Sequence, residues 1–303
     1  MKNVLVAGSS NTDMIIRVPR IPRPGETVLG GEFSMAAGGK GANQAVAAAR
    51  AGGRVTFVAR VGDDDLGARA LADLSTGGVD TRFVLRTPGT SSGLALITVD
   101  ERGENSISVV SGANALLSVE DVEAAAAAFS AADIVLLQLE SPLATVEAAL
   151  RLAKERGVPV ILNPAPAREL DDALLALVSL LTPNEHEAEI LTGIAVKDEP
   201  GARRAAGRLK ERGAAGVVIT LGERGVYASA GGFEGPAPAF KVDPVDTTAA
   251  GDVFNGALAV ALAEKHPMVE ALRFAQAAAA ISVTRAGAQP SAPTRAEIVA
   301  FIR

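Results

Sequence analysis

The sequence predicts an α/β fold in which helices cover both faces of a mostly parallel central sheet, with a small antiparallel sheet added to it. Three observations lead to this fold class. Short apolar runs bounded by turn residues alternate with longer segments rich in Ala, Leu, Glu and Arg. Hydrophobic residues make up 48% of the chain and aromatic residues only 3%, so the core must consist of small aliphatic side chains that let helices pack closely on a parallel sheet. Two pairs of strand-like segments have no helix between their members.

The apolar runs predict the strands of the main sheet, and the longer segments predict the helices between them. The expected strands are residues 4–7, 55–59, 134–139, 159–162, 179–181 and 217–221. The expected helices are residues 40–51, 65–75, 119–131, 143–156, 184–192, 200–212, 250–264 and 267–284. Because no linker or low-complexity tract interrupts this alternation, we expect one domain over residues 1–303.

The small sheet is predicted from residues 14–18 with 27–33, and from residues 93–99 with 105–110. The run from Asp100 to Gly103 joins the second pair as a hairpin turn would. These segments are inserted discontinuously, at about residues 12–36 and 86–112. We expect them to form a β lid that covers a site.

Composition excludes several classes of protein. The net charge is -6 and there is no Trp, so the surface would repel a nucleic-acid backbone and offers no stacking platform. Without cysteine there is no thiolate nucleophile and no zinc finger, and His186 and His266 lie too far apart in sequence to suggest a metal site. No segment has the length of a signal sequence or a membrane span, so we expect a cytoplasmic protein.

Polar and glycine-rich segments follow the predicted strands, and ligands of parallel sheets bind at the carboxyl ends of strands. Asn11 and Asp13 follow the first strand, although both residue types also form turns. Gly38, Gly39 and Lys40 open a helix that contains Asn43, where glycine lets a backbone approach a ligand closely. This is neither a Walker A loop nor a dinucleotide fingerprint, and an ordinary glycine-rich helix entry remains the alternative.

Three further segments occupy the same edge of the predicted sheet. Glu140 directly follows an apolar strand, where it could bind a hydroxyl group or simply be solvated. Asn184 and Glu187 have the spacing of a capping box. A role in holding magnesium and phosphates is the alternative explanation for these two residues. The run from Thr220 to Gly225 predicts a turn between two strands.

The run Asp246-Thr-Thr-Ala-Ala-Gly-Asp252 is the most informative. Its small residues, Ala249, Ala250 and Gly251, would leave backbone N–H groups bare at the start of a helix, where they could hold phosphoryl oxygens. Asp252 in the same turn could accept a hydroxyl proton. Taken alone, an acid at a helix start more often compensates the helix dipole.

Taken together, Gly38-Gly-Lys-Gly-Ala-Asn43, followed by Gly52 and Gly62, and the run 246–252 resemble the two signatures of the ribokinase-like (PfkB) carbohydrate kinases. Residues 138–142, 163–170 and 287–291 are similar to the ribokinase branch of that family. The resemblance runs in order along essentially the whole chain. It implies a three-layer α/β sandwich with a β lid, and a homodimer formed through the lids.

The resemblance also implies a role for each matching position. The sugar hydroxyls would be held by Asn11, Asp13, Gly39, Lys40, Asn43, Glu140 and Asp252, and Asp252 with Ala249, Ala250 and Gly251 would form the catalytic turn. The nucleotide would lie against Asn184, Thr220, Gly222, Gly225, Gly251 and Gln276, with Mg²⁺ organised by Asn184 and Glu187. A monovalent cation, K⁺, would lie near Asp246, Thr248, Ser282, Arg285, Gly287 and Ser291. Gln276 stands where the ribokinase pattern tends to have His near the adenine.

The mechanism expected from this family is transfer of the γ-phosphoryl group of ATP to a primary hydroxyl of D-ribose, with Asp252 as base. Another kinase of the family, acting on deoxyribose, fructose or a nucleoside, is the nearest alternative. A sugar-binding protein without activity should lack the base and the anion-binding turn, and this chain has both. A nicotinamide oxidoreductase is disfavoured by the missing dinucleotide fingerprint.

Overall fold

The main sheet of the computed structural model, which describes all 303 residues, has nine strands in the order β13-β12-β11-β10-β9-β8-β1-β4-β5. The strands from β5 to β11 pair in parallel, and β12 and β13 add an antiparallel edge. Their bounds are β1 Asn3–Ala7, β4 Arg54–Gly62, β5 Val79–Thr87, β8 Ile134–Leu137, β9 Val160–Leu162, β10 Leu180–Leu181, β11 Val217–Thr220, β12 Val226–Ala230 and β13 Phe233–Ala237. The predicted mostly parallel sheet is confirmed.

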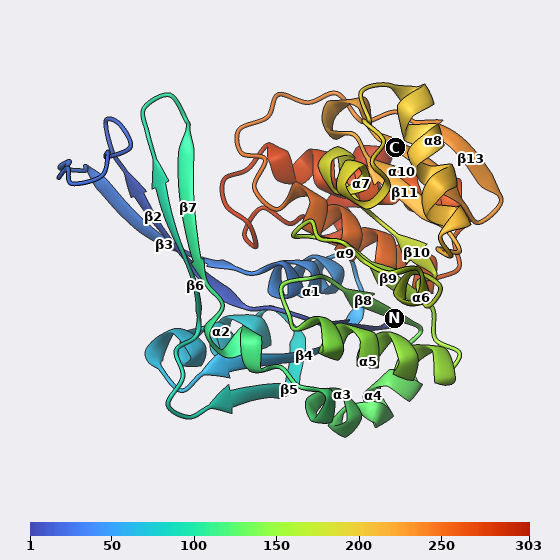
Figure 1. Ribbon diagram of the computed structural model, residues 1–303, viewed down its shortest axis with the longest axis horizontal. Coiled ribbons are helices and arrows are strands. Elements are labelled where there is room, and N and C mark those ends of the chain that lie inside the picture. The colour runs from blue at the N-terminus through green and yellow to red at the C-terminus, as the bar shows by residue number, and fades with distance from the viewer.

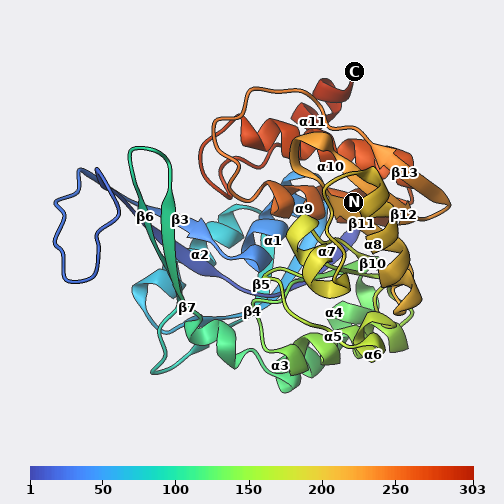
Figure 2. The same ribbon diagram turned by 45° about the horizontal axis from the view of Figure 1, so that its top comes forward.

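Helices lie on both faces of this sheet, which gives three layers (Figures 1 and 2). The helices are α1 Lys40–Arg50, α2 Asp65–Thr76, α3 Val119–Ala124, α4 Ala126–Ala131, α5 Leu143–Glu155, α6 Asp172–Leu175, α7 Glu185–Thr192, α8 Glu199–Glu211, α9 Ala250–Ala263, α10 Met268–Val283 and α11 Arg295–Ile302. None of them combines the length and the apolar character that crossing a membrane requires.

Strand alternation divides the core into two hydrophobic clusters, one on each face of the sheet. In β1, Val4 and Val6 pack with α1, α9 and α10. Leu5 and Ala7 point to the other face and pack with α3, α5 and α8. Buried alanines are numerous in both clusters, so helix backbones lie close to the sheet with few aromatic side chains.

A second sheet projects from one end of the main body (Figure 1) and has the order β3-β2-β6-β7. Its strands are β2 Asn11–Arg17, β3 Glu32–Gly38, β6 Gly93–Val99 and β7 Asn105–Val110. The outer pairs, β2 with β3 and β6 with β7, are antiparallel as predicted, whereas the central pair of β2 with β6 is parallel. The root of this sheet, where Asn11 pairs with Gly38 and with Gly93, adjoins the loop that precedes α1.

Several element boundaries differ from the predictions. The strand expected at 27–33 lies at 32–38, because pairing with β2 extends through Ala36 and Ala37, whose own strand propensity is low. The helix expected at 119–131 is two helices that meet at Ala125. Strands β5 and β13 and helices α6 and α11 were not expected. All four are short or mixed in pattern, and tertiary packing determines them.

Candidate active site

Polar side chains gather where β1, β8, β9 and β10 end, and the helices α1 and α9 begin at this edge of the sheet. The first polar residue after β8 is Gln138, after β9 Asn163, and after β10 Thr182. All three are buried. Gln44 of α1 bonds to Gln138 and to Asn163, and it connects both of them to Asp252 in the first turn of α9.

The loop before α1 can take its path only because it is built from glycine. Gly39 has φ 87°, and a Cβ atom there would lie 2.6 Å from the Asn11 backbone nitrogen. A Cβ atom on Gly38 would lie 2.4 Å from a carboxylate oxygen of Asp13. The two glycines therefore let the start of α1 lie directly against Asn11 and Asp13.

Glu140 joins this loop to the end of β8. Its Oε2 accepts hydrogen bonds from Ser9 Oγ at 2.5 Å and from the Lys40 backbone N–H at 3.0 Å. Gly41 N–H donates in turn to Ser9 Oγ at 3.2 Å. Glu140 therefore holds the first turn of α1 with one oxygen, and its other oxygen makes no side-chain hydrogen bond to the protein.

Asp252 is 6% exposed and accepts hydrogen bonds from two neighbouring residues of α1. Asn43 Nδ2 donates to Oδ2 at 3.0 Å, and Gln44 Nε2 donates to Oδ1 at 2.9 Å. Burial raises the pKa of Asp252, while the charge of Lys40 and the two amides act in the opposite direction. The carboxylate is thus buried, oriented and close to a cation.

Three other carboxyl groups share this space. The pKa of Asp13 is raised to about 6, mainly by burial and further by the charges of Glu140 and Asp252. Burial also raises the pKa of Glu187, and the charge of Lys40 lowers it. Four acids facing one lysine favour a ligand that brings hydroxyl donors or cations.

The turn from 246 to 252, called the anion turn below, leaves backbone donors free. Ala249 precedes α9 with φ 58°, which is left-handed, and its side chain cannot cap the helix. The N–H groups of Gly251 and Asp252 have no acceptor in the protein. In α1, by contrast, Glu140 and Ser9 already occupy the first N–H groups. Of these two helix starts, only α9 can accept an anion.

A second group of predicted residues lies around α7 and the turn between β11 and β12. Asn184 and Glu187 form the capping box that their spacing suggested, with hydrogen bonds of 2.8 Å in both directions. Asn184 also forms a parallel bridge with Thr220. This bridge places the α7 cap beside the turn that contains Gly222, whose φ is 57°.

Gly225 and Gln276 meet at the end of β13. A Cβ atom on Gly225 would lie 2.2 Å from the Ala237 carbonyl oxygen. Gln276 Nε2 donates to that same oxygen at 2.8 Å. The amide of Gln276 therefore ties α10 to β13, and its Oε1 and second N–H are left for a ligand.

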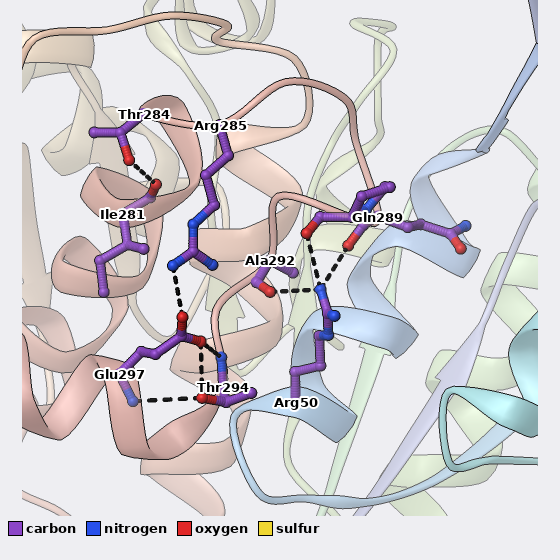
Figure 3. A network of polar contacts seen from close by, with 9 residues as sticks. Arg50, Ile281, Thr284, Arg285, Gln289, Ala292, Thr294 and Glu297 are labelled. Carbon is purple, nitrogen blue, oxygen red and sulfur yellow. Dashed lines mark hydrogen bonds and ion pairs between the residues drawn. The ribbon is translucent and has the colours of Figure 1, made fainter.

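The loop after α10 is connected to the anion turn through Asp246. Asp246 Oδ1 accepts from Thr248 N–H and Oδ2 accepts from Gly287 N–H, each at 2.8 Å. Burial alone would raise the pKa of Asp246, but these hydrogen bonds lower it. Figure 3 shows the other side of this loop, where Arg50 Nη1 donates to the carbonyl oxygens of Gln289, Pro290 and Ala292 at 3.2, 3.0 and 2.7 Å.

The other residues predicted near a monovalent cation make local contacts. The Ser282 hydroxyl donates to Ala279 O at 2.8 Å, and the Ser291 hydroxyl donates to Ala288 O at 2.7 Å. Arg285 turns towards α11 and pairs with Glu297 at 2.6 Å (Figure 3). Asp246, Thr248 and Gly287 are joined directly, whereas no side-chain contact links Ser282, Arg285 and Ser291 to them.

Some residues of the network were not among the predicted site residues. These are Gln44, Asn114, Gln138, Asn163, Thr182 and Asn255. The available signal was an amide or hydroxyl residue placed directly after an apolar strand, or inside an alanine-rich helix. A buried amide in such a place needs partners, and its partners come from distant parts of the chain.

Comparison with known proteins gives a consistent result. A family model described as pfkB family carbohydrate kinase matches residues 1–295. The chain is 48% identical to a ribokinase of Haemophilus influenzae over 99% of this chain and 98% of the relative. It is 40% identical to a deoxyribokinase of Salmonella typhi over 96% of each protein. The structure of Arabidopsis thaliana ribokinase complexed with ribose and ATP superposes with a TM-score of 0.92 at 32% identity, covering 100% of this chain and 98% of the other.

Proposed function

The chain belongs to the pfkB family of carbohydrate kinases, and from that premise we propose that it transfers the γ-phosphoryl group of ATP to the 5-hydroxyl of D-ribose, giving ribose 5-phosphate. One observation carries the proposal. Asp252 is a buried, amide-bound carboxylate in the same helical turn as two backbone N–H groups that have no acceptor in the protein. A phosphoryl group at those N–H groups would lie next to the hydroxyl that Asp252 deprotonates.

The sugar would lie between the loop before α1 and the end of β8. We propose that the hydroxyls of ribose donate to the carboxylates of Asp13 and Glu140 and accept from Asn11, Lys40 and Asn43, with the Gly39 backbone beside them. Asp13 and Glu140 would then gain hydrogen bonds that offset the repulsion between their charges. A polyhydroxylated ligand of few carbons meets that requirement better than an aromatic one.

Asp252 would act as the general base. Burial raises its pKa above the ordinary range, which makes the carboxylate a better proton acceptor while Lys40 and the two amides favour its charged form. The charge that develops on the transferred group would be stabilised by the N–H groups of Gly251 and of Asp252 itself, with Ala249 and Ala250 shaping the turn. Phosphoryl transfer depends mainly on positioning and charge stabilisation, and this turn supplies both.

The nucleotide would lie against Asn184, Gln276 and the turn that contains Thr220, Gly222 and Gly225. Mg²⁺ binds proteins through one or two carboxylates together with substrate phosphates and water, so it needs no dedicated cage. Glu187 fits, because only one of its two oxygens is used in the capping box. Bound there with Asn184, the ion would neutralise charge on the phosphates.

We further propose a monovalent cation, K⁺, as an activator beside the anion turn. The matching positions are Asp246, Thr248, Ser282, Arg285, Gly287 and Ser291. K⁺ is held by carbonyl and carboxylate oxygens. Arg285 could contribute only its backbone carbonyl, since its guanidinium pairs with Glu297.

Deoxyribose is the second candidate substrate, because the Salmonella typhi relative is named a deoxyribokinase. An ADP-release assay over pentoses, hexoses and nucleosides, with and without potassium, separates the two. We expect the highest kcat/KM with D-ribose and a higher rate with potassium. A kcat/KM for deoxyribose above that for ribose would reassign the substrate, and no activity with any sugar would refute the proposal.

Replacing Asp252 tests the chemistry itself. Asp252→Asn keeps the size of the side chain and removes the proton acceptor, so kcat should fall by about 10² to 10⁴. Ribose affinity, measured by calorimetry without nucleotide, should change little. A variant with near-native kcat would show that Asp252 is not the base.

A further inference from the structure

A buried amide network connects Asp252 to the ends of β8 and β9. Gln44 in α1 has no exposed surface, and Gln138 and Asn163 are 1% and 8% exposed. Gln138 Nε2 donates to Gln44 Oε1 at 2.6 Å, and Gln44 Nε2 donates to Asn163 Oδ1 at 3.0 Å and to Asp252 Oδ1 at 2.9 Å. Both N–H bonds and the oxygen of the Gln44 amide are therefore hydrogen-bonded within the protein.

The orientation of the Gln44 amide is determined by Asn163 and Asp252, which both present oxygens to its amino group. Asn163 Nδ2 donates to the Thr182 carbonyl oxygen at 3.0 Å, so Asn163 must present its oxygen to Gln44. Gln138 presents its amino group to Gln44 Oε1. With these two neighbours in place, Gln44 can only direct its amino group at Asp252. A reversed Gln44 amide would place an oxygen against a carboxylate.

Two adjacent residues of α1 hold the two oxygens of Asp252 separately. Asn43 binds Oδ2 and Gln44 binds Oδ1, so the plane of the carboxylate cannot rotate without breaking a hydrogen bond. The charged groups that influence Asp252 are Lys40, Glu140, Asp13 and Glu187, and none of them hydrogen-bonds to it. Only the two amides fix its orientation through side-chain contacts.

We propose that Gln44 is a positioning residue for the reaction: it holds Asp252 Oδ1 in place so that the carboxylate faces the acceptor hydroxyl, and Gln138 satisfies the Gln44 oxygen on the opposite side. This inference depends on the proposed role of Asp252 as base. It assigns to Gln44 a function separate from sugar binding, because its amide is fully used within the protein. Small errors in the placement of a reacting group reduce rates strongly.

Gln44→Met tests the inference, because methionine has nearly the same length and donates no hydrogen bond. We expect kcat to fall about tenfold, while the Kd of ribose changes by less than about threefold. The acid limb of the kcat profile should move to higher pH, since a donor that favoured the charged carboxylate has been lost. Gln138→Met should change kcat and the acid limb in the same directions but less, because Gln44 keeps its own amide.

Thr145→Val is the matched control. Thr145 is buried in α5, which packs in the other hydrophobic cluster, and its hydroxyl donates to Leu117 O at 2.6 Å and makes no contact with the amide network. This variant loses a buried hydrogen bond and should lower Tm without changing kcat or the acid limb. If Gln44→Met also lowers only Tm, the amide merely fills the core and the inference is wrong.

The outcomes also separate this inference from the proposed function. If Asp252→Asn loses activity as predicted but Gln44→Met keeps the native kcat and pH profile, the positioning role of Gln44 is refuted and the role of Asp252 as base is retained. Near-native activity of Asp252→Asn refutes the base and the positioning role together. If Gln44→Met does not fold, Gln138→Met decides, and an unchanged kcat profile in that variant counts against the inference.

Discussion

At the scale of single residues, the hydrogen-bond partners of Asp252 distinguish it from the acids that cap other helices. Asp121, Glu187 and Glu297 occupy the third helical position of α3, α7 and α11, and each accepts the N–H of its own N-cap residue. Asp252 occupies the same position of α9, but it points inward to Asn43 and Gln44. Helix capping therefore explains the acids at this position in three helices, but it does not explain Asp252.

Asp13 provides a pH-dependent prediction for ligand binding. Its pKa of about 6 means that Asp13 loses its charge as the pH falls below about 6. A protonated Asp13 is a weaker acceptor for a sugar hydroxyl, so the KM for ribose should rise as the pH falls through this range. Asp13→Asn should have a high KM that no longer varies there, and an unchanged pH dependence in this variant would rule out Asp13 as the cause.

Asp13 also affects the stability of the fold, and here the protonated form is the favourable one. Because the folded-state pKa lies above the ordinary value of 3.8, the folded protein binds more protons than the unfolded protein between these pH values. The free energy of unfolding should therefore fall as the pH rises from about 4 to about 6. At pH 8, Asp13→Asn should be more stable than the native protein by about 1 kcal/mol, after allowance for partial exposure, and its Tm should be higher. Thermal unfolding of both proteins at pH 4 and pH 8 measures this, and a Tm of Asp13→Asn below that of the native protein at pH 8 would contradict it.

How far the sequence predicts the site depends on how local the signal is. Asp252, Asn43 and the glycines stand in short motifs, and the structure brings the first two into direct contact. Gln44 was not expected, because nothing near it in sequence distinguishes a buried amide from an exposed one. Its partners Gln138 and Asn163 become neighbours only when β8 and β9 pair, and this pairing is a property of the fold.

At the scale of elements, the strands and helices with strong periodicity were predicted to within a few residues, and the exceptions share a cause. Strand β6 (Gly93–Val99) and strand β7 (Asn105–Val110) have the predicted bounds, because a tight turn and alternating side chains define them locally. Strand β3 is displaced by about five residues, because its register depends on β2. Helix α6 has only four residues and carries no periodic signal at all.

Arg50 links two elements that the proposed reaction needs. It ends α1, whose first turn adjoins the proposed sugar site, and it binds three carbonyls of the loop whose Gly287 holds Asp246. Arg50→Ala should speed amide exchange in residues 286–292 several-fold and raise the potassium concentration for half activation. The Kd of ribose should stay the same. The surface variant Arg151→Ala, which loses only a pair with Glu147, is the control, and equal exchange in both variants would refute the link.

The second sheet should respond to the sugar if it acts as a lid. Its first strand carries Asn11 and Asp13 at the root, while every residue of β7 is exposed. Ribose that binds at the root and is covered by the sheet should slow amide exchange in residues 14–35 and 93–110 by about threefold or more. Exchange in α5 should not change. Protection limited to Asn11 and Asp13 would show that the second sheet does not act as a lid.

At the scale of the whole molecule, the second sheet has an outer face that a single chain leaves uncovered. The register places Phe33, Ile16, Leu96 and Val110 on one face and Asp13 on the other. Phe33 is 64% exposed, Val110 52% and Leu96 48%. Contiguous apolar surface of this kind is typical of a protein interface, and a long exposed edge strand such as β7 is another site where chains associate.

We therefore predict a homodimer in which the outer faces of two second sheets pack together. Light scattering should give twice the mass of one chain at working concentration. Leu96→Glu places a charge at the centre of the apolar face, where a dimer would have to bury it, so this variant should be monomeric. Val269→Glu adds the same charge at a similarly exposed apolar position of α10, away from the second sheet, and should remain dimeric. A monomeric native protein, or a dimer that Leu96→Glu leaves intact, would show that this face does not form the interface. Loss of the dimer together with a weaker Kd for ribose would further mean that each second sheet needs its partner to hold the closed position over the sugar.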